Sequence, residues 1–283
     1  MSHGSSQEPV GGVAERVTVI DDLADPRVAD YRNLKEADLS RLRGAFIAES
    51  EVVLRVLVSR GRYPIRSVFL AESRLDKVAD ALRALPPEVP IYVAPQAVLS
   101  GVVGFRLHRG VLASGERPAG DDLATILGEA RRVVVLEGLT NHDNVGSVFR
   151  NAAAFGVDGV ILDETSCDPL YRKAIRVSVG ASLFVPWTRS PSTAASLAAL
   201  REAGFFVIAL SPRLDAMPLE QAVPRDGRKV ALLVGTEGPG LTTASMGRAD
   251  VVARIDMAPG FDSLNVATAT GIGLFVLRSA NPG

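Results

Sequence analysis

Short apolar runs in the first half of the chain alternate between strand-like and helix-like spacing. Continuous runs of a few apolar residues are typical of strands, and apolar positions three or four residues apart indicate helices. The predicted strands are residues 46–48, 65–71, 90–94 and 110–113. The predicted helices are residues 51–59, 75–85 and 95–103. Because strands and helices alternate, we expect residues 39–115 to form a compact α/β unit.

The second half of the chain has apolar runs without any polar alternation. Residues 133–136 and 231–234 are uninterrupted aliphatic stretches, which indicates strands buried on both faces, as in a parallel sheet. The predicted strands are residues 132–137, 157–162, 183–186, 205–210, 229–234 and 251–255. The predicted helices are residues 145–155, 192–203 and a last helix entered at Ser263. Residues 131–283 are therefore predicted to be a second α/β domain.

The last helix has an unusual composition. Ser263 is its predicted N-cap, with Asp262 suited to the positive end of the helix dipole. From Leu264 to Leu277, apolar residues cover nearly its whole circumference, so we expect a buried helix rather than an amphipathic one.

The N-terminal segment and the predicted interdomain linker are more polar. Residues 1–38 are expected to be a tail and lead-in, with disorder over residues 1–15 because these are rich in Gly, Ser and Pro. Residues 116–130 are expected to be a linker and lead-in to the second domain. No basic segment is followed by an apolar run, and no apolar segment reaches about 18 residues, so neither a signal peptide nor a membrane span is predicted.

Composition limits the chemistry. The 283 residues carry a net charge of -1, so RNA binding would depend on local patches. One cysteine and three histidines leave no disulfide and no predicted metal site, which favours a cytoplasmic protein. Basic residues outnumber acidic ones within residues 39–115, and Arg60, Arg62 and Arg109 are among them. These arginines are either a solvated surface or an RNA-binding face.

Three loops carry candidate chemistry. The first, residues 137–156, holds Asn144 and Arg150; both approach the carboxyl edge of the sheet if Asn144 is in the loop and Arg150 in the helix. The second, residues 232–241, is a glycine turn that lacks the pattern of a P-loop or a dinucleotide site, and Glu237 is its informative residue. The third, residues 255–277, contains the C-terminal helix.

In this order, the three loops resemble the motifs of the SpoU (TrmH-like) family of RNA ribose 2'-O-methyltransferases, in the SPOUT superfamily. The resemblance covers about residues 131–280, and residues 39–115 look like the family's L30e-like RNA-binding domain. It implies a SPOUT domain with a parallel sheet and a deep trefoil knot, a homodimer, and S-adenosylmethionine as cofactor.

The resemblance also implies roles for individual residues. It implies a catalytic set of Arg150, Asn144, Glu237, Ser263 and Asn265. It implies a cofactor-binding set of Gly235, Ile255, Met257 and Leu264. It places RNA contacts near Arg172, Lys173 and Arg176, which a solvated helix face would also explain. We expect Arg150 to bind a phosphate and stabilise the developing alkoxide, since an arginine is normally protonated.

Two positions depart from the family pattern. Residues 141–144 are Asn-His-Asp-Asn where the family commonly has Asp-Pro-x-Asn. Asp256 stands where the family commonly has proline, which puts a charge beside the expected cofactor pocket. Neither departure removes a residue with an implied role.

The favoured function is an S-adenosylmethionine-dependent 2'-O-ribose methyltransferase of structured RNA, with rRNA favoured over tRNA because a separate reader of folded RNA suits rRNA. The alternative from another class is a catalytically silent RNA-binding or ribosome-assembly factor of the same fold. A third interpretation is an unrelated small-molecule nucleotide binder.

Overall fold

The computed structural model describes residues 13–34 and 43–280 of the chain. These divide into two compact units, Met1–Arg117 and Pro118–Gly283. The disorder predicted for residues 1–15 falls mainly outside the described residues. Where they begin, Val13 is buried and a 3-10 helix, η1 (Ala14–Arg16), follows it, so that end of the prediction is wrong.

The first unit is built on a mixed sheet of five strands, among the residues described. In sheet order the strands are β1 (Val17–Val19), β4 (Ile91–Ala94), β3 (Ile65–Ala71), β5 (Val111–Glu116) and β2 (Ala45–Glu49). The helices are η2 (Pro26–Tyr31), α2 (Glu51–Arg60), η3 (Glu72–Arg74), η4 (Asp76–Val78), α3 (Ala79–Arg83) and α4 (Gln96–Val103). The single helix predicted over residues 75–85 is thus two short pieces.

Residues expected to be a lead-in contribute to the core of this unit. Strand β1 pairs in parallel with β4, which makes it an edge of the sheet. The buried hydroxyl of Tyr31 donates to the carbonyl of Ser67 and accepts from the amide of Ser114, tying this segment to β3 and β5. The first unit of the structure therefore begins before residue 39.

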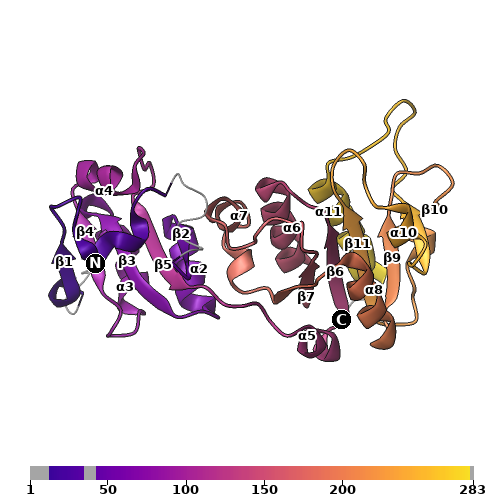
Figure 1. The fold of residues 1–283 in the computed structure, drawn as a ribbon, viewed down its shortest axis with the longest axis horizontal. Coiled ribbons are helices and arrows are strands. Elements are labelled where there is room, and N and C mark those ends of the chain that lie inside the picture. The colour runs from indigo at the N-terminus through magenta and orange to yellow at the C-terminus, as the bar shows by residue number, and fades with distance from the viewer. Residues whose placement is uncertain (1–12, 35–42, 281–283) are drawn as a thin grey trace, which may run out of the picture. The chain divides into compact units, whose positions relative to one another are not determined.

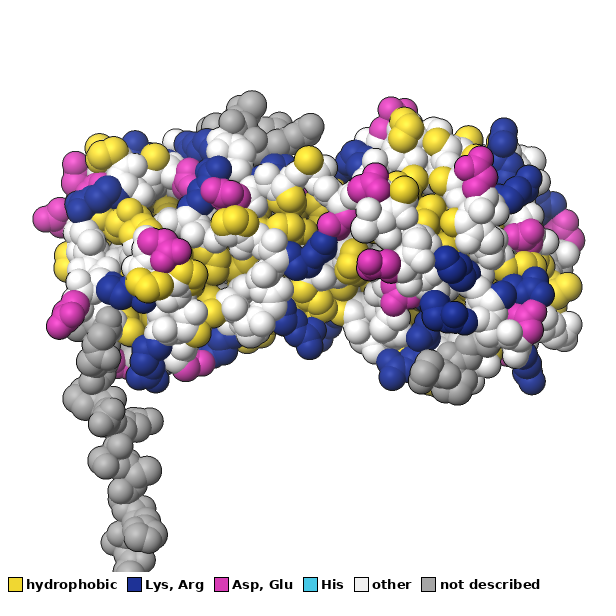
Figure 2. Space-filling view, turned by 90° about the horizontal axis from the view of Figure 1, so that it is seen from below, with side chains coloured by type: hydrophobic (Ala, Val, Ile, Leu, Met, Phe, Trp, Pro, Cys, Tyr) yellow, Lys and Arg dark blue, Asp and Glu magenta, His cyan; other side chains and the backbone are white. Residues whose placement is uncertain are grey.

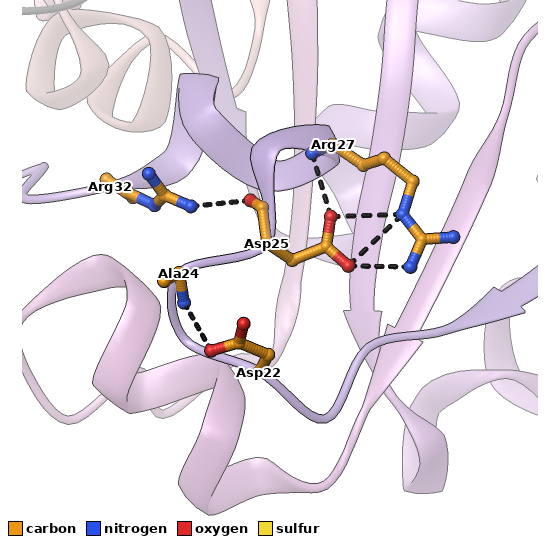
Figure 3. A network of polar contacts seen from close by, with 5 residues as sticks. All are labelled: Asp22, Ala24, Asp25, Arg27 and Arg32. Carbon is orange, nitrogen blue, oxygen red and sulfur yellow. Dashed lines mark hydrogen bonds and ion pairs between the residues drawn. The ribbon is translucent and has the colours of Figure 1, made fainter.

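The turn into η2 is held by a carboxylate (Figure 3). Asp25 caps η2 by accepting from the amide of Arg27, and it also pairs with the Arg27 guanidinium at 2.6 Å. Arg32 donates to the Asp25 carbonyl. The hydrogen bond from the Arg27 side chain is the largest cause that lowers the pKa of Asp25 from 3.8 to about 2.

The second unit contains a wholly parallel sheet, which confirms the predicted α/β class (Figure 1). In sheet order its described strands are β10 (Met217–Pro218), β12 (Val251–Arg254), β9 (Phe206–Leu210), β11 (Val230–Gly235), β6 (Arg132–Glu137), β7 (Gly159–Leu162) and β8 (Trp187–Arg189). The predicted strand at residues 183–186 is wrong, because Leu183 ends the 3-10 helix η5 (Ala181–Leu183) and the strand begins at Trp187.

Helices cover both faces of this sheet. They are α5 (Leu123–Glu129), α6 (His142–Phe155), α7 (Arg172–Val177), α8 (Thr193–Glu202), α9 (Leu219–Ala222), α10 (Thr243–Met246) and α11 (Val266–Ala280). Helices α5 and α8 pack on one face, in a core that includes Val133 and Leu233. On the other face, a Cβ on Gly273 of α11 would lie 2.9 Å from the Leu232 side chain, so α11 packs closely there, with α6 beside it (Figure 1).

The C-terminal helix differs from its prediction in two ways. It begins at Val266, because the Asn265 side chain, and not Ser263, accepts from the amides of Ala267 and Thr268. It is also buried on one side in this chain, whereas Phe275 on the other side is 59% exposed. Among the described residues, no helix combines the length and apolarity needed to cross a membrane.

Candidate active site

A cavity of about 410 Å³ lies at the carboxyl ends of β9, β11 and β12, three neighbouring strands. Its walls are the segments that follow these strands, together with the start of α11. The four residues implied as cofactor-binding, Gly235, Ile255, Met257 and Leu264, all line it. A ligand at this edge is the usual arrangement in open parallel α/β sheets.

The glycine turn after β11 forms one wall of this cavity. A Cβ on Gly235 would lie 2.5 Å from the backbone of Gly240 and Leu241, so no larger residue fits there. Gly238 and Gly240 have φ values of +85° and +68°, which L side chains rarely adopt. The turn therefore needs glycine for its own fold, and it presents backbone groups to the cavity.

Three polar side chains implied as catalytic meet at the edge of this cavity. The side-chain amide of Asn265 donates to the Asn144 amide oxygen at 3.0 Å and to Glu237 at 2.7 Å. Asn144 lies within α6 and is buried, so its expected place in the loop before the helix is wrong. The reason is that the Asn141 side chain caps α6 and starts it at His142.

The charge of the cavity is negative. Of the described residues that line it, Glu237 is the one with a charged side chain, and the others are apolar or neutral. Ser263 lines the cavity but is exposed, and its hydroxyl lies 3.4 Å from the carboxylate of Asp262. A site of this kind suits a ligand with apolar surface and positive charge better than one with phosphates.

Arg150 lies outside this cavity. It is exposed on α6 and has no hydrogen bond or ion pair with any residue that the structure describes. It lines a second hollow, a groove between α6 and α11 that also contains Phe155, Ile272 and Phe275. Asn265 lines both hollows, so the groove and the cavity meet at this residue.

Comparison with known proteins identifies a family whose matching segment contains the cavity and the groove. The SpoU rRNA Methylase family matches residues 131–275, the segment that contains all three loops. The chain belongs to the SpoU family. The predicted resemblance is thereby confirmed.

SpoU-family relatives extend over most of the chain. An uncharacterised tRNA/rRNA methyltransferase of Mycobacterium bovis is 40% identical over 259 residues, which cover 90% of this chain and 89% of the relative. A 23S rRNA (guanosine-2'-O-)-methyltransferase of Salmonella typhimurium is 29% identical over 78% of this chain and 93% of the relative. The AdoMet-bound rRNA methyltransferase of Sinorhizobium meliloti has a TM-score of 0.78 and 26% identity, over 93% of this chain and 98% of that chain.

Sequence reasoning missed a carboxylate that supports the glycine turn of this SpoU-family site. Glu137, the last residue of β6, accepts from the hydroxyls of Ser245 at 2.5 Å and Thr242 at 3.0 Å, and from the Thr242 amide at 3.1 Å. Thr242 also caps α10. Glu137 therefore fixes the end of the turn that carries Glu237. Its only sequence signal is an acidic residue at the end of a buried strand.

A second missed carboxylate supports the loop that enters α6. Asp163, which is buried, accepts from the Gly138 amide at 3.0 Å and from the hydroxyls of Thr165 and Ser166. The Ser166 hydroxyl in turn accepts from the Leu139 amide. These contacts fix the first residues of the loop that precedes Asn144.

The start of α6 is also joined to α7. The rings of His142 and Tyr171 lie 4.0 Å apart between centroids, and Lys173 pairs with Asp143 at 2.7 Å. Burial is the largest cause that lowers the pKa of His142, so its ring packs in the neutral form at neutral pH. The ring contact and the ion pair thus hold residues 141–144, where this chain departs from the family pattern.

The residues predicted to contact RNA lie in both units. Arg60, Arg62 and Arg109 are exposed in the first unit, and Arg62 lies 5.8 Å from the centre of the Tyr63 ring. Arg172, Lys173 and Arg176 lie on α7 in the second. On the face in Figure 2, Lys and Arg side chains are scattered among acidic ones rather than gathered in one patch. Among the residues described, no group of three or more His, Cys, Asp and Glu could hold a metal ion.

Proposed function

We propose that this chain transfers a methyl group from S-adenosylmethionine to a ribose 2'-hydroxyl of structured RNA, with rRNA favoured over tRNA. The observation that carries the proposal is the Asn144–Asn265–Glu237 network at the edge of the cavity. Membership of the SpoU family supports it, as does the 2'-O-methyltransferase named among the relatives.

The cavity fits the proposed cofactor. Ile255, Met257 and Leu264 offer apolar surface to an adenine ring, and Gly235 permits close backbone approach. Glu237 is the charged side chain that faces a positive ligand, and no described lysine or arginine lines the cavity to receive phosphates. The same observation weighs against an unrelated nucleotide binder. When bound, S-adenosylmethionine supplies an electrophilic methyl group on a sulfonium.

The residues around the cavity then have separate tasks. Asn265 orients the Glu237 carboxylate, which we expect to accept the proton that the ribose hydroxyl loses when its oxygen takes the methyl group, with Asn144 and Ser263 beside it. Arg150 binds the adjacent RNA phosphate and stabilises the alkoxide that develops as the hydroxyl loses its proton. Positive charge on the six predicted RNA-contact residues would add affinity without base specificity.

We further infer that the chain acts as a homodimer through the groove between α6 and α11. Phe155 and Phe275 lie 6.3 Å apart between ring centroids, and Phe275 is exposed in the single chain. A second copy over this groove would bury these rings. It would also bring Arg150 towards the partner's cofactor, which a single chain does not do.

Three further parts of the proposal concern fold and location. We propose that the segments around residues 235–265 form the deep trefoil knot, supported by the close fold-back of the turn onto Gly235. We propose that the first unit is the L30e-like RNA-binding domain, supported by its α/β fold on a mixed five-stranded sheet among the residues described. We propose a cytoplasmic location, where RNA and cofactor are both present.

The deciding experiment maps ribose methylation at nucleotide resolution in total RNA, with and without the protein. One added methylated position, in rRNA, is the expected result, and calorimetry should detect binding of S-adenosylmethionine. An unchanged map would contradict the proposal. If the cofactor also failed to bind, a catalytically silent RNA-binding factor would replace it.

A further inference from the structure

Arg254, the last residue of β12, joins two loops on the same side of the cavity. Its Nε donates to Asp256 at 2.8 Å, and its Nη1 donates to the carbonyl of Ala216. These donors lie on different edges of one planar guanidinium, so a single side chain contacts both loops. The Arg254 side chain is 25% exposed, so its guanidinium is mostly covered, whereas the Asp256 side chain is 64% exposed.

The first loop connects β9 to β10. It begins at Ser211, whose amide donates to the Ala253 carbonyl at 2.9 Å, and it ends at Ala216, which Arg254 holds. Ser211 and Pro212 line the cavity. Both ends of the loop are therefore attached to β12, and the cavity wall lies between the attachments.

The second loop follows β12 directly. Asp256 lies between Ile255 and Met257, which both line the cavity. The ion pair with Arg254 restrains the backbone at Asp256 and hence both lining residues. The charge at Asp256 is thus directed towards Arg254, at the end of the strand.

We propose that Arg254 is a positioning residue that sets the affinity for S-adenosylmethionine, because its guanidinium fixes the spacing of the two cavity walls. This inference rests on the proposed function. Arg254 itself is not among the lining residues, so it acts through Asp256 and Ala216. A lysine would keep the charge but could not present two donors in this fixed geometry.

A purely structural role makes a different prediction. Strand β10 pairs with β12 through Pro218 and Arg254, so Arg254 could merely secure the edge of the sheet. In that case its loss would lower thermal stability and leave cofactor affinity unchanged. The chain provides a matched control in Arg213, which pairs with Asp215 at 2.7 Å in the same first loop without contacting β12 in that ion pair.

The test is calorimetric titration of the full chain with S-adenosylmethionine, beside hydrogen exchange of the two loops. Arg254→Met is expected to weaken binding about tenfold, and Arg254→Lys about threefold, since contacts to charged groups are lost. Exchange over residues 211–216 and 255–261 should quicken in both variants. Arg213→Met should change affinity by less than about twofold, as expected for an exposed ion pair.

Each outcome decides between the two roles. Wild-type affinity in the Arg254 variants, with a lower melting temperature, would overturn the inference and leave the proposed function intact. If Arg213→Met weakened cofactor binding equally, the inference would be overturned as well, because loss of any positive charge in these loops would then have the same effect. If Arg254→Met does not fold, Arg254→Lys decides. A wild-type chain that binds no cofactor would overturn both the inference and the proposed function.

Discussion

The side-chain amide of Asn265 lies 2.7 Å from the Glu237 carboxylate, so one residue joins the start of α11 to the glycine turn after β11. The same side chain caps α11 through its oxygen. Asn265 therefore both caps α11 and orients Glu237, and two substitutions can separate these roles.

We expect Asn265→Asp to keep the cap and lose the network. An aspartate oxygen still accepts from the α11 amides, but it cannot donate to Glu237 and repels it. Methyl transfer should fall by about 10- to 100-fold, for a loss of about 1.4 to 3 kcal/mol, with little change in melting temperature. Asn265→Ala should lose both, so its melting temperature should also fall. Equal activity of the aspartate variant and the wild type would remove the network from the mechanism.

Arg150→Ala is expected to abolish methylation without changing the fold. Arg150 is exposed and contacts no described residue by hydrogen bond or ion pair, so stability should change by less than about 0.5 kcal/mol. Turnover is measured on the RNA and cofactor affinity by calorimetry. Cofactor affinity should stay close to that of the wild type, since Arg150 does not line the cavity. Retained turnover would exclude the assigned role.

Glu137→Gln should destabilise the second unit and weaken cofactor binding. The Glu137 carboxylate accepts two hydrogen bonds at Oε1, from Thr242 and Ser245, and one at Oε2, from the Thr242 amide. A glutamine keeps one acceptor oxygen, and the NH2 group that replaces the other oxygen cannot accept. We expect a loss of about 1–3 kcal/mol in urea unfolding. Glu129→Gln, an exposed change at the end of α5, is the control and should be nearly neutral. An unchanged free energy of unfolding in Glu137→Gln would show that the glycine turn keeps its conformation without Glu137.

Two glycine substitutions should have opposite effects. At Gly235 an alanine Cβ would lie 2.5 Å from the Gly240 backbone, so Gly235→Ala should lose cofactor binding and much of its stability. At Gly128, in α5, a Cβ would meet nothing within 4 Å, so Gly128→Ala should stabilise by about 0.5–1 kcal/mol. Melting temperature and calorimetry test both. A stable, cofactor-binding Gly235→Ala would contradict the described turn.

The ion pair at Asp25 predicts a pH dependence of stability in the first unit. Its pKa is lowered from 3.8 to about 2, chiefly by the Arg27 side chain. A lowered carboxyl pKa stabilises the fold above the unfolded pKa, and this contribution is lost as the pH falls from about 4 to about 2. Asp25→Asn should therefore melt below wild type at pH 7, and the difference should shrink across this range. Asp22→Asn, whose amide oxygen can still accept from the Ala24 amide, is the control.

Local signals explain which elements were predictable. Strands β3 and β6 have the predicted bounds, because each contains an apolar run, residues 68–71 and 133–136, with polar residues on both sides. Helix starts are harder to predict, since several polar residues compete as caps. Asn141 and Asn265 accept the capping bonds, whereas Ser263, a good capping residue by type, does not.

The site was predictable where the sequence resembles the motifs of the SpoU family. That resemblance implied the cofactor set, and all four of its residues line one cavity. Glu137 and Asp163 were not predictable in the same way. Their partners lie 105 and 25 residues away, and only the pairing of the strands brings them together.

The position of Asn265 between the cavity and the groove has a thermodynamic consequence. If filling the cavity shifts this side chain, the groove must respond, and the two binding events are linked. Linkage is reciprocal, so the factor by which the cofactor strengthens association of two copies over the groove equals the factor by which association strengthens cofactor binding. In a chain with Asn265→Ala, cofactor affinity and dimer affinity would then be independent of each other.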